Sequence, residues 1–490
     1  MNLFRKNRVP IVAYIVISAV LAMGISFWIG IHQSVWFDEA YSILVAKQGV
    51  GHIIHLVSLD THPPGYYILL HAWGSLFGWG AVSLRLLSEL AMGGALVVAG
   101  LLVRRLFGDR AAIFSVILAA IAPLLLRYGF EIRMYALASL IGVAATYVLV
   151  AARADAGRYA WRWILYGVLV AVGMLTLYQL ALLWLAHVAW LAYVDRKHLK
   201  QVWLLPWARA YVGAFILFVP WLPKFIGQIG NGSLANIGQP MNIEQLLGAV
   251  SFNILYEPLW QVGVAGTLVL IAAIVGAVWA WRYTYRQRKL REHLLLLTLY
   301  IAVPIVLFMV ISLVRPMYVE RYLSQVAIGL IMLFGVITAA VTKKMPKAHR
   351  MVVHVLAAGS MLAGVYQLAV VGNYNFQRMQ KPAVAQVAHT IDCNGATVVA
   401  ADPYVETELS YYLPTSCSTH FYSQWATLGG GYAPYSNSPL RLASKNILPM
   451  GKRLYYVYYG EPQLNVAATY TKTATYTKGG LTVVTYETHS

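Results

Sequence analysis

The chain has 490 residues, of which 59% are hydrophobic and only 11% are charged, and its formal net charge is +19 at pH 7. A soluble domain of this length does not need so much apolar surface, so the composition excludes an ordinary soluble protein and indicates a chain that crosses a membrane several times. An excess of 37 basic over 18 acidic residues would also suit a nucleic-acid-binding protein, unless the basic residues follow a membrane topology.

Apolar runs of roughly 17 to 25 residues are long enough to cross about 30 Å of hydrocarbon. Eleven such runs are predicted as membrane spans, at 10–31, 82–103, 111–127, 134–152, 161–178, 179–194, 208–222, 262–281, 294–314, 323–341 and 351–371. The first run lacks a small-residue cleavage site, so we interpret it as a retained anchor and not as a signal peptide. The predicted fold class is an α-helical polytopic membrane protein.

The basic residues gather in alternate loops between these spans. The segments 5–8, 104–110, 153–162, 195–209, 282–292 and 343–350 hold 22 of the 37 basic residues but only four of the 18 acidic ones. Cytoplasmic loops of membrane proteins carry this excess, so the N-terminus and these loops are expected on the cytoplasmic side and no nucleic-acid partner is expected. The loops at 32–81 and 223–261, the segments 127–133 and 315–322, and all residues after 371 are then expected on the outer face of the cell membrane.

The composition changes after residue 371 to a polar, strand-forming pattern. Residues 1–371 are therefore predicted to form the membrane domain, and residues 372–490 a small extracytoplasmic α/β domain. Its predicted elements are helices at 383–391 and 405–413 and strands at 397–401, 453–459 and 481–486. The tetrapeptide Thr-Tyr-Thr-Lys occurs twice, at 469–472 and 475–478, which we interpret as the mark of a hairpin.

The two cysteines, Cys393 and Cys417, both belong to this second domain. An oxidising compartment would permit a disulfide between them, closing a span of 24 residues in the sequence. Two buried thiols are the alternative, because the sequence does not supply the distance between the two residues.

Asp38 and Glu39 lie just beyond the outer end of the first predicted span. Ionisable residues at a membrane boundary are costly to desolvate, which makes such a pair a candidate for function. A carboxylate there can act as a general base toward a hydroxyl group. The alternative is helix capping, since Asp38 begins a plausible amphipathic helix through Lys47 and Glu39 would then lie in its first turn.

The same outer loop contains Asp60 and His62, and the two prolines after His62 stiffen the chain before Tyr66. Several other histidines lie nearby, but no cysteine accompanies them and their spacing matches no structural zinc pattern. No metal site is predicted.

Two further clusters of charged and aromatic residues lie at outer ends of later spans: Arg127, Glu131, Arg133 and Tyr135 in one, and Arg315, Glu320, Arg321 and Tyr322 in the other. Guanidinium groups stay charged and suit bidentate binding of phosphate oxygens, so Arg133 and Arg321 suggest an anionic substrate group. The alternatives are ion pairs with Glu131 and Glu320, or side chains that extend toward the membrane interface.

In combination, these motifs resemble those of a family 39 type glycosyltransferase of the GT-C fold, a group that includes the protein O-mannosyltransferases and the transferases that add aminoarabinose to lipid A. The resemblance covers residues 10–340. It is carried by the acidic pair at 38–39, the Pro-Pro segment at 63–64, Arg133-Met134-Tyr135 and Glu320-Arg321-Tyr322.

The resemblance implies a sugar donor on a polyprenyl phosphate in the membrane lipid, and an acceptor hydroxyl or phosphate on a protein, lipid or envelope glycan. Asp38 would be the base of an inverting reaction, Glu39 would support it, and Arg133, Arg321 and His62 would hold the donor phosphate. The remaining residues expected near the substrates are Asp60, Tyr66, Glu131, Tyr135, Glu320 and Tyr322. No cofactor is required, and a divalent metal is not excluded.

His62 departs from the pattern of the aminoarabinose transferases, which commonly have a lysine before the two prolines. A permanent cation is replaced by a side chain whose charge depends on pH, which puts its phosphate contact in doubt.

Two other function classes fit a polytopic chain with arginines at one face. A transporter or flippase of a lipid-linked sugar would need polar residues through the middle of its spans, where this chain has few. A receptor with an outer binding domain would leave the charged clusters at the membrane boundary unexplained.

Overall fold

The computed structural model describes residues 10–154, 159–230, 290–314, 319–343, 345–366, 383–423, 438–442, 444–447 and 450–488, with isolated positions between 271 and 286 and at 368–369. The chain divides into two compact units. The helical unit comprises Met1–Gly30, Arg85–Phe225 and Ala235–Asn373, and the sheet unit comprises Ile31–Leu84, Ile226–Leu234 and Tyr374–Ser490. The expected domain boundary at 371–372 lies outside the described residues and stays a prediction.

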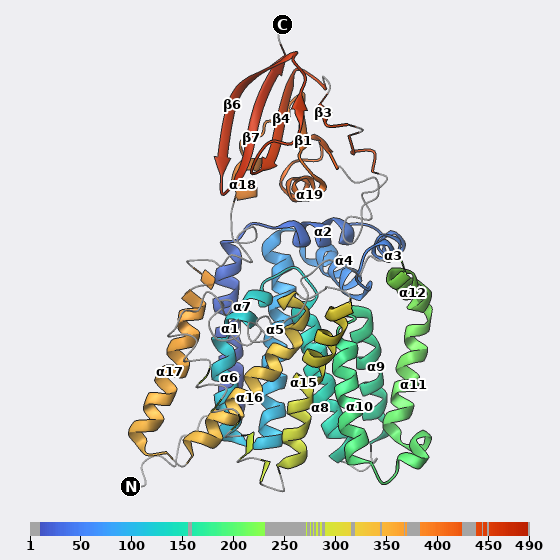
Figure 1. Ribbon diagram of the computed structural model, residues 1–490, viewed down its shortest axis with the longest axis vertical. Helices are drawn as coiled ribbons and strands as arrows, with labels where there is room; N and C mark the ends of the chain where they lie inside the picture. The colour runs from blue at the N-terminus through green and yellow to red at the C-terminus, as the bar shows by residue number, and fades with distance from the viewer. Residues whose placement is uncertain are drawn as a thin grey trace. The chain divides into compact units, whose positions relative to one another are not determined.

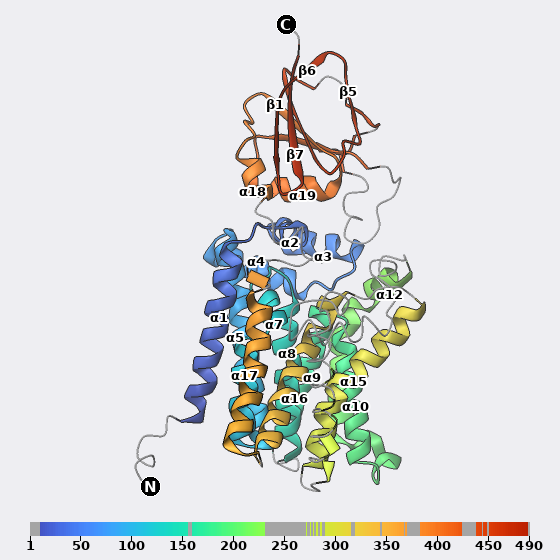
Figure 2. The same cartoon turned by 60° about the vertical axis from the view of Figure 1, so that its left-hand side comes forward.

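Long apolar helices build the helical unit (Figures 1 and 2). They are α1 (Ile11–Ile31), α5 (Ala81–Phe107), α6 (Asp109–Ala120), α7 (Pro123–Gly129), α8 (Tyr135–Ala154), α9 (Ala160–Thr176), α10 (Leu180–Val194), α11 (Pro206–Phe218), α12 (Leu222–Gly230), α15 (Arg291–Val314), α16 (Ser324–Thr342) and α17 (Lys347–Tyr366), with 3-10 turns η1 (Leu199–Leu204), η2 (Val219–Trp221) and η4 (Glu320–Leu323). Within the described residues, six helical runs are long and apolar enough to cross a membrane, and the bent pair α6–α7 is a seventh candidate. The chain is a multi-pass membrane protein.

The expected count of eleven spans is not reached in the part of the chain that the structure describes. Each expected segment that is described coincides with a helix, but α9 and α10 have only 17 and 15 residues, and α17 is not among the helices that are apolar enough. The span expected at 262–281 lies outside the described residues except for isolated positions.

The span expected at 111–127 is broken in two, with a bend of 62° between α6 and α7. Pro123 opens α7, and Ala122 before it is extended, with φ −79° and ψ 112°. A proline cannot donate the backbone hydrogen bond that would continue α6, and it forces its predecessor out of the helical region. As a result, Arg127 lies in the separate short helix α7 and not in a continuation of α6.

The helix ends that carry the basic loops meet at one end of the helical unit. Arg110 at the start of α6 donates to Thr342 Oγ1 at the end of α16 over 3.0 Å, and Arg153 at the end of α8 binds Asp195 after α10 over 2.9 Å. These contacts agree with the prediction that the basic loops lie on one side of the membrane domain. The orientation of this end in the membrane stays a prediction.

A polar network joins four helices inside the unit. The Thr146 hydroxyl of α8 and the Tyr166 hydroxyl of α9 bind the two ring nitrogens of His187 on α10, over 3.0 and 2.9 Å. The Tyr166 hydroxyl also lies 2.8 Å from the hydroxyl of Tyr211 on α11. Because a buried polar group without a partner is costly in an apolar medium, this network fixes how α8 to α11 pack.

Replacing Tyr166 with phenylalanine should destabilise the protein by roughly 1 to 2 kcal/mol, because His187 and Tyr211 lose a shared buried partner. The free energy of unfolding would be measured by denaturant titration in detergent micelles. Tyr193→Phe is the control, since Tyr193 on α10 is 39% exposed. Equal effects of the two changes would contradict the role of the network.

The sheet unit combines the first loop with the C-terminal residues. The loop forms α2 (Phe37–Ala46), α3 (Val50–Leu59) and α4 (Gly65–Phe77). The C-terminal part forms α18 (Ala383–Ala388), α19 (Pro403–Tyr412), β1 (Ala396–Ala400), β2 (Ser418–Phe421), β3 (Asn446–Ile447), β4 (Arg453–Tyr459), β5 (Asn465–Val466), β6 (Tyr470–Lys478) and β7 (Leu481–Thr488).

A five-stranded mixed sheet with the order β2-β1-β4-β7-β6 forms the centre of the C-terminal part. β1 runs parallel to β2 and β4, and β7 is antiparallel to β4 and β6. Alternation along β1 sends Val398 into the core beneath α18 and α19 and Val399 into a second core on the other face, with Tyr456. The mixed sheet with helices agrees with the expected α/β class.

The repeated tetrapeptide lies in a β-hairpin, as expected. Both copies lie along β6 and the residue before it, separated by a register irregularity between Lys472 and Ala474, and the hairpin partner is β7. β6 is an exposed edge strand, where polar and charged side chains disfavour pairing with another chain. The repeated Thr and Lys residues therefore lie along one exposed edge strand.

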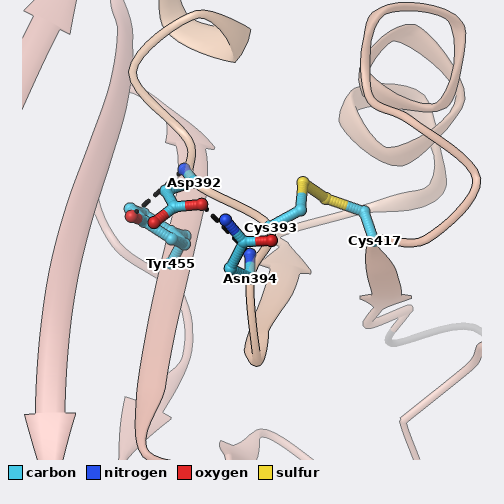
Figure 3. The surroundings of a disulfide bond; sticks show 5 residues. All are labelled: Asp392, Cys393, Asn394, Cys417 and Tyr455. Carbon is cyan, nitrogen blue, oxygen red and sulfur yellow. Dashed lines mark hydrogen bonds between the residues drawn. A yellow bond between two sulfur atoms is a disulfide. The ribbon is translucent and has the colours of Figure 1, made fainter.

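Cys393 and Cys417 are joined by a disulfide, with their Cα atoms 5.0 Å apart (Figure 3). Cys393 precedes β1 and Cys417 precedes β2, so the bond closes the segment that contains β1 and α19. The turn before β1 is further held by Asp392, whose amide donates to the Tyr455 hydroxyl and whose carboxylate accepts from the Asn394 amide.

Burial raises the pKa of Glu406 on α19, although the hydroxyls of Ser410 and Thr419 donate to its carboxylate. At pH values between the ordinary pKa and the raised one, Glu406 is protonated in the folded protein and ionised in the unfolded chain. The stability that this group contributes therefore falls as pH rises through this range. Glu406→Gln keeps the acceptor oxygen and removes the charge. The variant should gain unfolding temperature over wild type at pH 7 and lose that gain at pH 4.

The unfolding temperature of the detergent-solubilised full-length protein at both pH values checks this. Glu461→Gln, at an exposed glutamate of the same domain, serves as the control. A gain for Glu406→Gln that is the same at both pH values would contradict the effect of ionisation.

Candidate active site

Asp38 and Glu39 lie in the first turn of α2 and differ in exposure. Glu39 is 1% exposed, and its Oε2 accepts a weak hydrogen bond of 3.4 Å from the backbone amide of Trp36, the residue that precedes the helix. Asp38 is half-buried. The structure thus gives Glu39 the capping function that the alternative interpretation placed at Asp38, and leaves Asp38 as the more accessible carboxylate of the pair.

Asp60 and His62 form a compact turn at the end of α3. Asp60 Oδ2 lies 3.3 Å from His62 Nδ1, and the Thr61 hydroxyl bridges the two side chains at 3.3 and 3.0 Å. Gln228 donates to the carbonyl oxygens of Val57 and His62, at 2.7 and 3.3 Å. A carboxylate at Nδ1 holds the imidazole in one orientation, with Nε2 as its other polar atom.

Tyr66 is buried at the start of α4 within an aromatic group of the same unit. Its ring centroid lies 6.1 Å from that of Tyr67, which in turn lies 6.3 Å edge-on from that of Tyr41 on α2. His71 Nδ1 is 2.7 Å from the carbonyl oxygen of Ala46, the last residue of α2. These contacts pack α4, which follows the two prolines, against α2, which carries Asp38.

In the helical unit, Arg127 and Glu131 form a buried ion pair with 3.8 Å between Nη2 and Oε1. The guanidinium of Arg127 also lies over the ring of Phe130, 4.8 Å from its centroid. Arg127 was placed from the sequence in the cluster with Glu131, Arg133 and Tyr135, but it was not predicted as a site residue. Its position four residues before Glu131 was the signal, because that spacing brings the two side chains together.

Arg85, Ser88 and Glu89 are three polar residues of α5 that the sequence reasoning missed. Arg85 donates to the Gly30 carbonyl oxygen, Ser88 donates to the Glu131 carbonyl oxygen over 2.6 Å, and Glu89 accepts from Ser26 over 2.7 Å. The spacing i, i+3, i+4 in an apolar span was the signal that could have identified them. They fix the segment before Arg133 against α1 and α5.

Arg133 lies between α7 and α8 and is buried, as is Tyr135 at the start of α8. The Arg133 amide donates to the Glu131 carbonyl oxygen over 2.7 Å, and the rings of Tyr135 and Tyr128 pack edge-on at 5.4 Å. Glu131 and Arg133 therefore both lie in one tight turn between α7 and α8.

Arg321 lies in η4, directly before α16, and is half-buried over the ring of the buried Tyr322 at 5.8 Å. The Tyr322 ring packs edge-on against Phe308 of α15 at 6.3 Å. Residues 315–318 and the side chain of Glu320 lie outside what the structure describes.

A small cavity links these elements of the helical unit. Its lining includes Tyr128 and Gly129 of α7, Ala136 of α8, and Ser324 and Ile328 of α16. Of the three short segments with arginines, α7, which holds Arg127, lines this cavity, whereas Arg133 and Arg321 precede the helices α8 and α16 that line it elsewhere. Asp38, Asp60, His62 and Tyr66 belong to the sheet unit, so each unit assembles two of the four clusters expected from the sequence. Over the described ranges, no three His, Cys, Asp or Glu side chains are grouped to hold a metal ion.

Comparisons with known proteins bear on the family and the fold. The family model for dolichyl-phosphate-mannose-protein mannosyltransferases matches residues 61–223, a range that includes His62 and Arg133 but neither Asp38 nor Arg321. No curated protein sequence matches the chain.

Two solved structures of ArnT from Cupriavidus metallidurans resemble the chain. The form bound to undecaprenyl phosphate has a TM-score of 0.62 at 15% identity and covers 96% of this chain and 98% of that chain. The apo form has a TM-score of 0.63 at 16% identity with the same coverage. The apo oligosaccharyltransferase of Archaeoglobus fulgidus has a TM-score of 0.52 at 12% identity, covering 93% of this chain and 70% of that one.

The likeness to ArnT covers residues of both units, so the chain has a known fold. Residues 61–223 match the dolichyl-phosphate-mannose-protein mannosyltransferase family, and the fold is that of ArnT, so both comparisons agree with the resemblance drawn from the sequence motifs.

Proposed function

We propose that this protein transfers a sugar from a polyprenyl-phosphate donor to an acceptor hydroxyl or phosphate on a protein, lipid or envelope glycan, with inversion at the anomeric carbon. The observation that carries the proposal is the family match over residues 61–223. The solved ArnT complex with undecaprenyl phosphate supports the same class of lipid donor for this chain.

Asp38 is the proposed general base. Its carboxylate accepts the proton of the acceptor hydroxyl while the acceptor oxygen forms a bond to the anomeric carbon. The bond from that carbon to the phosphate oxygen breaks, and its electron pair leaves with the polyprenyl phosphate. The greater exposure of Asp38 relative to Glu39 supports this choice, because Glu39 is already engaged by the Trp36 amide.

Arg133 and Arg321 are proposed to bind the donor phosphate and to stabilise the charge that develops on it as the sugar leaves. Arg133 directly precedes α8 and Arg321 directly precedes α16, and both residues belong to the helical unit. Arg127 is a weaker candidate, because Glu131 already offsets its charge. The scheme needs no cofactor.

His62 is proposed to donate a hydrogen bond from Nε2 to the same phosphate. The Asp60 carboxylate, 3.3 Å from Nδ1, fixes the orientation of the ring and leaves Nε2 as its other polar atom. In this way a histidine and an aspartate replace the lysine of the related transferases.

The outer face of the cell membrane is the proposed location of the reaction, with the N-terminus in the cytoplasm. The meeting of the basic loops at one end of the helical unit supports this orientation.

The test is a transfer assay with the purified protein in vesicles, a labelled polyprenyl-phosphate sugar, and acceptors of the three classes. Product that carries the labelled sugar supports the proposal. Movement of intact labelled lipid across the vesicle membrane without any product would instead establish a flippase.

A further inference from the structure

The three backbone amides that directly precede Asp38 are all hydrogen-bonded. Val35 N–H donates to the Tyr412 hydroxyl over 2.6 Å, Trp36 N–H donates to Glu39 over 3.4 Å, and Phe37 N–H donates to Glu408 Oε1 over 3.0 Å. The first four amides of a helix region usually lack backbone partners, so side chains that bind them decide how the helix begins.

Two of the three acceptors come from α19 of the C-terminal domain, which packs beside α2 within the sheet unit (Figure 2). The Phe37 ring also stacks on Tyr404 of α19, with centroids 4.3 Å apart and planes at 20°. A third acceptor on α19, the hydroxyl of Tyr411, accepts from the Ala81 amide at the far end of the first loop over 2.9 Å. One helix thus holds both ends of the loop.

The position of α19 is itself well fixed. Asp402 caps the helix by accepting from the Val405 amide over 2.9 Å, and Pro403 opens its first turn. Val405 and Leu409 pack into the core beneath the sheet, and the disulfide closes the segment that contains the helix. The acceptors on α19 therefore stand on a rigid support.

We infer that Glu408 is a positioning residue for the proposed reaction, which holds the start of α2 so that the Asp38 carboxylate points toward the acceptor. The inference rests on the proposed function of Asp38. It assigns the C-terminal domain a part in catalysis, since the side chain that fixes the catalytic helix belongs to that domain.

The chemistry of the contact supports this role. Glu408 is only 1% exposed, and a carboxylate is buried at such cost only where it is hydrogen-bonded. Its Oε1 takes the place of the backbone acceptor that an amide at the start of a helix lacks. With Val35 to Phe37 held, Asp38 retains little freedom beyond its side-chain torsions, and a shift of about 1 Å at a catalytic group can lower the rate about 100-fold.

Glu408→Ala, Glu408→Gln and Glu406→Ala in the full-length protein test the inference. Glutamine keeps the acceptor oxygen for Phe37, whereas alanine removes it. Glu406→Ala is the matched control, because Glu406 lies two residues earlier on the same helix and binds Ser410 and Thr419 instead of α2. The readouts are amide hydrogen exchange of residues 35–42, kcat for transfer and KM for the donor.

Glu408→Ala should speed exchange of residues 35–42 about tenfold or more and lower kcat roughly 10- to 100-fold, with the donor KM within about twofold of wild type. Glu408→Gln should restore both, and Glu406→Ala should change neither. Unchanged exchange in Glu408→Ala, an unchanged kcat beside an active wild type, or an equal loss in Glu406→Ala would overturn the positioning role. Absence of transfer by the wild type would instead count against the proposed function, while the exchange data would still decide whether Glu408 holds α2.

Discussion

Asp38→Asn should lower the rate of sugar transfer by roughly 10²- to 10⁴-fold, the range that a positioned general base contributes. Asparagine has nearly the same size as aspartate and fits the first turn of α2 equally well, but its amide does not accept the proton of the acceptor. Single-turnover kinetics with saturating donor would measure the chemical step. The donor KM should stay within about twofold of wild type, because the change leaves the arginines in place.

Glu39→Gln separates catalysis from capping. The glutamine oxygen can still accept from the Trp36 amide, so this variant should keep the transfer rate within about threefold of wild type. Should Glu39→Gln lose as much activity as Asp38→Asn, the acids would act as a pair and the assignment of Asp38 alone would be wrong. Full activity in Asp38→Asn would remove Asp38 from the mechanism.

Arg133→Ala and Arg321→Ala should each raise the donor KM by roughly 30- to 150-fold, corresponding to about 2 to 3 kcal/mol for a lost charge-assisted hydrogen bond to phosphate. The physical reason is that each guanidinium is expected to bind phosphate oxygens with two of its N–H groups. Lysine at either position should recover only part of the loss, because an ammonium group does not reproduce the planar fork. Steady-state kinetics over a range of donor concentrations would give these values.

Arg104→Ala is the control for a general loss of positive charge. Arg104 pairs with Asp109 over 2.9 Å in an exposed position at the basic end of the helical unit, and exposed pairs contribute little to stability. This variant should leave the donor KM unchanged. Donor KM values that do not move in either Arg133→Ala or Arg321→Ala would exclude these residues from the phosphate site.

The membrane helices could be predicted from the sequence because an apolar span needs only length and composition. The expected segment 10–31 corresponds to α1 (Ile11–Ile31), and 323–341 corresponds to α16 (Ser324–Thr342). The bend before Pro123 was not predicted, since hydropathy averages over a window and does not register that one proline breaks the backbone hydrogen bonds.

The C-terminal sheet was predictable where strands alternate between two apolar faces. The strand expected at 453–459 matches β4 in both bounds. β6 was missed as a single strand because it lies at the sheet edge and is exposed along nearly its whole length, so it lacks the apolar alternation that marks a buried strand.

The acidic pair shows what sequence reasoning leaves open at the site. Two adjacent carboxylates in a first helical turn are both candidates for capping, and only the structure shows that Glu39 takes this role. The contact of Phe37 with Glu408 was equally hidden, because 371 positions separate the two residues in the chain. Contacts between residues so far apart in the sequence depend on the fold of the whole chain, and local sequence patterns do not predict them.

The anomeric configuration of the product tests the central claim most directly. Wild-type protein would be incubated with a polyprenyl-phosphate sugar of known configuration and each acceptor class, and the configuration of the new glycosidic bond would be read by NMR. A single displacement with Asp38 as base predicts inversion. Retention of configuration, which requires a covalent or otherwise two-step route, would contradict the account.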